Sequence, residues 1–74
     1  MSILSVMDQS GHSEHAFDPK DGAATAKMLE IVREHVNEKK FMLAERGPDG
    51  QVSKVGVFNP NAIESLLIPQ LRGG

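Results

Sequence analysis

One amphipathic helix pattern dominates the middle of this 74-residue chain. From Ala23 onward, apolar residues recur at helical spacing and charged residues mostly fill the opposite side. The stripe consists of Met28, Leu29, Ile31, Val32, His35 and Val36. No other segment shows this period, so the helix has no helical neighbour to cover its stripe. A single helix of this kind buries its stripe against a sheet, which predicts a two-layer α+β domain.

The remaining segments have the composition of strands and are separated by turn residues. We expect a hairpin from strands at 2–7 and 12–17 around Gly11, and a second from 41–46 and 51–58 around the turn at 47–50. In the return strand, Val55 and Val57 are expected to share a face, and Gly56 to mark a bulge or a close approach.

The boundaries of the helix and of the last strand follow from proline chemistry. Asp18 is expected to cap the helix, with Pro19 at the first helical position, where its missing N–H is tolerated. The last strand is expected at 64–68, apolar on both faces as in a central strand. It should leave the sheet at Pro69, which cannot donate to a strand ladder.

Composition excludes several function classes. The net charge is −2 with acids and bases intermixed, so no basic surface indicates a nucleic-acid partner. The chain has no cysteine, which excludes disulfides, thiolate zinc sites and cysteine nucleophiles. Apolar runs such as 66–68 are far too short for a membrane span, and no signal-peptide pattern is evident. We therefore expect a cytoplasmic protein without a membrane or nucleic-acid partner.

The histidines and the hydroxyl residues do not form a recognisable catalytic site. His12 and His15 are expected on opposite faces of a strand, and no carboxylate spacing completes a metal site. His35 lies at the edge of the helix stripe, where a half-buried packing role is expected. Ser10 and Asp8 lack the spacing of a catalytic triad. The chain is therefore expected to be no enzyme and to carry no metal or cofactor.

The C-terminal residues carry a resemblance to a known family. Leu71, Arg72, Gly73 and Gly74 match the end of mature ubiquitin residue for residue, and 67–74 is similar to the bacterial sulfur carriers, the molybdopterin-synthase small subunit and the thiamine sulfur carrier. The order of strands and helix also resembles the β-grasp fold of this family. The resemblance in element order spans the chain, whereas close motif identity is confined to these last residues.

The resemblance implies a fold and a reaction. The last strand would lie centrally and parallel to the first, giving the sheet order 2-1-5-3-4, with a domain at 1–69 and a flexible tail at 70–74. An activating enzyme would adenylate the carboxylate of Gly74. Gly73 and Gly74 would thread a narrow channel because glycine lacks a Cβ. Arg72 would pair with an acidic group of that enzyme, and Leu71 would fill an apolar pocket. The sequence leaves open whether the acceptor is sulfur, a protein lysine or nothing.

The alternative is a β-grasp structural or assembly module, or a non-covalent regulator, in which the tail is incidental. The segments at Phe17 and Phe58 are similar to those of small bacterial and phage proteins that end in Gly-Gly. Either function needs a docking surface, and Met42, Ala44 and Val55 are candidates for it. The sequence leaves open which of these three side chains faces the helix.

Overall fold

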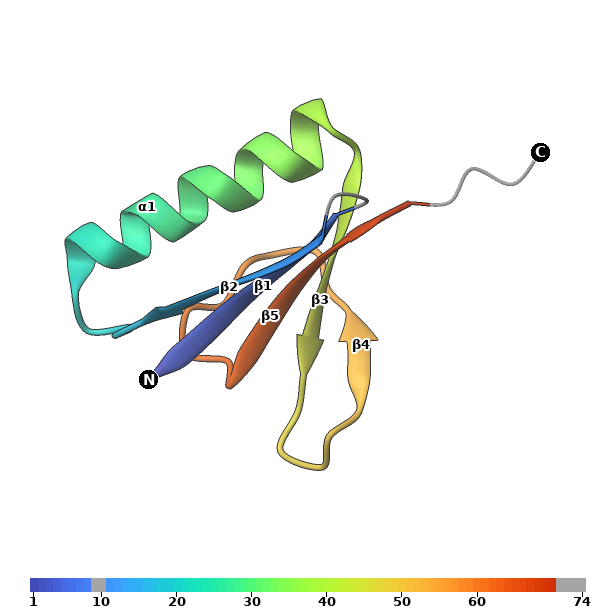
Figure 1. The fold of residues 1–74 in the computed structure, drawn as a ribbon. Helices are drawn as coiled ribbons and strands as arrows, with labels where there is room; N and C mark the ends of the chain where they lie inside the picture. The colour runs from blue at the N-terminus through green and yellow to red at the C-terminus, as the bar shows by residue number, and fades with distance from the viewer. Residues whose placement is uncertain (9–10, 71–74) are drawn as a thin grey trace.

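A helix crosses one face of a five-stranded sheet in the computed structural model, which describes residues 1–8 and 11–70 (Figure 1). The elements in chain order are β1 (Ser2–Asp8), β2 (Gly11–Phe17), α1 (Gly22–Arg33), the π-helical turn η1 (Glu34–Glu38), β3 (Phe41–Arg46), β4 (Val52–Lys54) and β5 (Glu64–Pro69). The protein is therefore an α+β domain with a β-grasp-like fold, which confirms the expected class.

The strand order is β2-β1-β5-β3-β4, as predicted. β1 and β5 are parallel, with Leu4 opposite Ser65, and the other neighbouring strands are antiparallel. β5, the last strand, lies in the centre of the sheet. It includes Pro69, which pairs with Phe41 of β3, so the strand runs one residue beyond the predicted end at 68.

The core forms where the helix stripe meets alternate residues of the strands. Met28 and Val32 of α1 are buried, and Ile31 and Val36 are half-buried against the same cluster. From the sheet the cluster includes Leu4, Val6, Phe17, Leu43 and Leu67. Because strand side chains alternate between faces, these residues identify the face that the helix covers. The apolar stripe of the helix therefore packs on the sheet, as the sequence predicted.

The predicted helix cap was wrong by three residues. Asp21, not Asp18, is the N-cap: its carboxylate accepts hydrogen bonds from the N–H groups of Ala23 (3.1 Å) and Ala24 (3.2 Å). Asp18 instead closes a turn, because its side chain accepts from the N–H of Lys20 (2.9 Å) and its carbonyl from the N–H of Asp21 (2.9 Å). Either aspartate could cap a helix, but the turn at Asp18 delays the start of the helix, so Asp21 is the residue that caps it.

The return strand of the second hairpin is shorter than predicted. β4 ends at Lys54, and after the N–H of Val55 donates to the carbonyl of Leu43 (3.0 Å) the chain turns away from β3. Phe58 packs against Phe17 of β2, with ring centroids 6.2 Å apart. Val55 packs against the core whereas Val57 is 79% exposed, so the two valines do not share a face. Nothing lies within contact distance of a Cβ built on Gly56, which excludes the predicted close approach.

Candidate functional site

The tail residues that the sequence singles out, Leu71, Arg72, Gly73 and Gly74, lie outside the described residues. The described chain ends at Gln70, directly after the central strand β5. β5 is held by β1 on one side and by β3 on the other. The tail therefore starts from the centre of the sheet rather than from an edge strand.

The face of the sheet opposite α1 has no helix over it in the part of the chain that the structure describes (Figure 1). Strand alternation and the register assign six buried or half-buried apolar side chains to this open face: Ile3, Met7, Met42, Ala44, Leu66 and Ile68. Ala44 and Leu66 are 1% and 2% exposed, so neighbouring side chains alone enclose them. The other four are half-buried.

The strand register shows which of the three docking candidates face the helix and which face away from it. Met42 and Ala44 lie on the open face, opposite Ile68 and Leu66 of β5. Val55 lies on the helix side, where it packs against the core. Two of the three candidates therefore lie on the open face, where Met42 is half-buried and Ala44 is enclosed by its neighbours. Such a surface, rimmed by polar groups, is typical of a protein docking site.

A polar clamp crosses this open face. Glu64 of β5 accepts a hydrogen bond from the hydroxyl of Ser5 in β1 (2.6 Å) and another from Nε of Arg46 in β3 (2.8 Å). Arg46 also donates to the carbonyl of Gly50 in the turn between β3 and β4 (3.1 Å). The hydrogen bond from Ser5, followed by that from Arg46, lowers the pKa of Glu64 below its ordinary value. The clamp holds the carboxylate charged and joins the three central strands.

Sequence reasoning missed this clamp. Ser5 and Glu64 are 59 residues apart, and Arg46 and Glu64 are 18 apart, so no local motif links them. The one available signal is that Ser5 interrupts an apolar run within its strand. Because a hydroxyl buried in a central strand is normally hydrogen-bonded, this serine indicates a polar partner.

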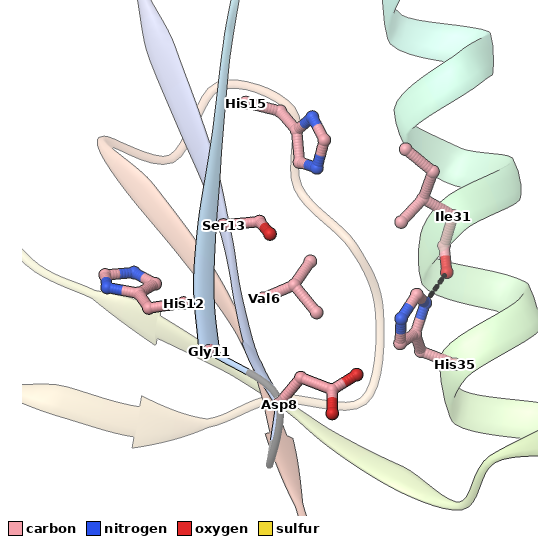
Figure 2. A pocket seen from close by; sticks show the side chains of 8 residues that line it. All are labelled: Val6, Asp8, Gly11, His12, Ser13, His15, Ile31 and His35. Carbon is pink, nitrogen blue, oxygen red and sulfur yellow. Dashed lines mark hydrogen bonds between the residues drawn. The ribbon is translucent and has the colours of Figure 1, made fainter.

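A pocket of about 430 Å³ lies between β2 and α1 (Figure 2). Ser13 and His15 point toward the helix, and His12 points away from it, so His12 and His15 lie on opposite faces as predicted. Nδ1 of His35 lies 2.8 Å from the carbonyl of Ile31, and its ring meets Phe41 edge-on at 5.0 Å. His35 is half-buried, as expected of a packing residue.

The described residues hold no group of three or more His, Cys, Asp or Glu side chains that could bind a metal ion. No helix within 1–8 and 11–70 is long and apolar enough to cross a membrane.

The chain was also compared with protein-family models, with curated proteins and with solved structures, and it matches none of them.

Proposed function

We propose that this protein is a cytoplasmic ubiquitin-like modifier or sulfur carrier whose Gly74 carboxylate is adenylated by an activating enzyme. The observation that carries the proposal is topological. In a β-grasp-like sheet, the tail begins one residue beyond the central strand β5, at Gln70. A rigid central strand gives the tail a fixed origin, and Gly73 and Gly74 at its end allow close approach to a nucleotide.

The chemistry asks little of this chain beyond the carboxylate. An oxygen of Gly74 would attack the α-phosphorus of ATP, forming an acyl-adenylate and releasing pyrophosphate. A thiolate or another sulfur nucleophile would then attack the acyl carbon and release AMP, leaving a thioester or a thiocarboxylate. A lysine amine attacking the thioester would give an isopeptide bond and return the thiol. All catalytic groups would belong to the partner enzymes.

The folded body would supply the affinity for the activating enzyme. Ordering a peptide tail in a channel costs conformational entropy, so contacts elsewhere must offset that cost. The open face, on which Ile3, Met42 and Ile68 are only half-buried, is an apolar surface suited to this role. Arg72 would pair with an acidic side chain at the channel entrance, and Leu71 would fill an apolar pocket.

The test is adenylation of the purified protein with ATP and each adenylating enzyme of the source organism. Mass spectrometry should show an AMP adduct or a thioester on Gly74, and deletion of Gly73 and Gly74 should abolish it while urea unfolding is unchanged. The intact mass of the protein from its native host establishes whether Gly74 is the free C-terminus. A carboxylate that stays unmodified with every enzyme tested would contradict the proposal.

The open face also favours a second candidate, a non-catalytic interaction or assembly module. Its apolar side chains suit non-covalent binding whether or not the tail reacts. This alternative predicts that replacing Gly73 and Gly74 with alanines leaves function intact. The carrier or modifier predicts that the same replacement impairs adenylation, because two Cβ atoms would then enter the channel.

A further inference from the structure

A second apolar surface lies at the outer edge of β3, apart from the centre of the open face. β4 pairs only with Ala44, Glu45 and Arg46, so among the described residues the first half of β3 has a strand neighbour on one side only. On the other side, the chain from Lys54 to Phe58 diverges from β3 and leaves a groove of about 410 Å³. The C-terminal half of the helical segment forms the opposite wall of this groove.

The groove is lined mainly by apolar side chains that continue the core. Val32 and Leu43 at its base are buried core residues, and Val36, Phe41, Val55 and Phe58 are half-buried against the same cluster. Val57 lines the groove and is 79% exposed. Removing such apolar surface from water is favourable, so the groove is expected to bind an apolar group.

The charged side chains that line the groove have one sign. Among the described residues that line it, only Arg33 and Lys54 are charged. The ion pairs of the described residues join His12 to Glu14 and Arg46 to Glu64, so neither Arg33 nor Lys54 has an acidic partner there. Two unpaired cations beside an apolar groove favour a ligand with acidic residues next to its apolar ones.

The backbone around the groove favours an extended ligand. No strand within 1–8 and 11–70 pairs with Phe41 or Met42 on the groove side, so this edge of β3 can accept another strand, as in β-strand addition. The helix wall there is irregular: η1 contributes Val36 and Asn37, and Lys40 just beyond it has a φ of 60°. π-helical turns are rare and occur frequently at functional sites.

We infer that this groove binds an extended, apolar peptide segment flanked by acidic residues. The segment would belong to the activating enzyme, an assignment that rests on the proposed function. Gln70 lines the groove, and the four residues that follow it reach at most about 14 Å. An enzyme that holds Gly74 must therefore lie close to the groove.

The test uses a synthetic peptide with a Leu-Val-Leu-Phe centre and two aspartates at each end, titrated into the isotope-labelled full chain. Saturable amide shifts are expected at 32–37, 41–43 and 55–58. A peptide with lysines in place of the aspartates should bind at least about fivefold more weakly. Val57→Asp should weaken binding of the acidic peptide about tenfold, because it removes an apolar contact and adds repulsion.

Ile63→Asp is the matched control, because Ile63 is also an exposed apolar residue, at 56%, but does not line the groove. It should bind the peptide as the wild type does. The inference is overturned if no saturable shifts occur, if they map to the open face, if Val57→Asp binds normally, or if both peptides bind equally.

The outcomes separate the groove from the proposed function. Peptide binding should survive deletion of Gly73 and Gly74, and it would stand even if Gly74 were never adenylated. Conversely, if Gly74 is adenylated and Val57→Asp leaves kcat/KM for the enzyme unchanged, the proposed function stands and the enzyme does not use the groove.

Discussion

The hydroxyl of Ser5 donates a 2.6 Å hydrogen bond to the carboxylate of Glu64, joining the two parallel central strands β1 and β5. Arg46 adds a charged hydrogen bond of 2.8 Å from β3 to the same carboxylate. Glu64 is thus held by both strands that flank β5, on the face that the helix leaves open. The clamp ties the strand from which the tail starts to the rest of the sheet.

The clamp should make stability depend on pH. Because the folded pKa of Glu64 is below its ordinary value, the stabilisation is fully present above that ordinary value and is lost as pH falls through the folded pKa. Glu64→Gln should lower the free energy of unfolding at about pH 7 by about 1–2 kcal/mol. The difference from the wild type should shrink at about pH 3, measured by urea unfolding at both pH values.

Glu14→Gln is the control for this experiment. Glu14 lies 3.8 Å from His12 in an exposed pair, which should change stability by less than about 0.5 kcal/mol. A loss in Glu64→Gln that is no larger than the loss in Glu14→Gln would show that the clamp does not stabilise the sheet.

The helix cap gives a second prediction. Asp21→Ala removes the acceptor for two helix N–H groups and should lower the free energy of unfolding by about 1 kcal/mol. Asp18→Ala removes one exposed turn hydrogen bond and should cost about half as much. Thermal unfolding followed by circular dichroism measures both. A larger loss in Asp18→Ala would place the cap where the sequence pattern first indicated it.

Several features set by interactions between residues close in sequence were predicted correctly, whereas several features set by residues distant in sequence were not. The buried Met28 and Val32 were predictable because helix periodicity is local, and the turn at Gly50, with a φ of 84°, because turn chemistry is local. The early end of β4 was not, because it depends on Phe58 reaching Phe17, 41 residues away in sequence (58 − 17). The clamp at Glu64 likewise depends on Ser5, which lies 59 residues away in sequence.

A third prediction compares two adjacent leucines of β5. Leu67 is 0% exposed between sheet and helix, and Leu66 is 2% exposed on the open face. Leu67→Ala should cost about 3–4 kcal/mol, because two packed layers around it cannot close the cavity. Leu66→Ala should cost about 2 kcal/mol, because only side chains of a single layer surround it and they can relax into the space.

Equilibrium unfolding in urea gives both values for these leucine variants. Equal losses would mean that the open face is packed as rigidly as the core. A loss in Leu66→Ala below about 0.5 kcal/mol, typical of a surface substitution, would mean that this face is not enclosed by its neighbours.

The last prediction concerns the backbone at the end of the helical segment. Lys40 has a φ of 60°, a left-handed conformation that costs a residue with a Cβ about 1–2 kcal/mol. Lys40→Gly removes that penalty and loses part of the gain through greater freedom in the unfolded chain, so a net stabilisation of about 0.5–1 kcal/mol is expected. Lys39→Gly is the matched control, because Lys39 has an ordinary φ of −96°. This substitution should instead lower the free energy of unfolding by about 0.5–1 kcal/mol. Opposite signs for neighbouring lysines, measured by urea unfolding, would isolate the backbone effect from the loss of charge. Destabilisation of similar size in both variants would show that residue 40 does not hold a left-handed conformation in solution.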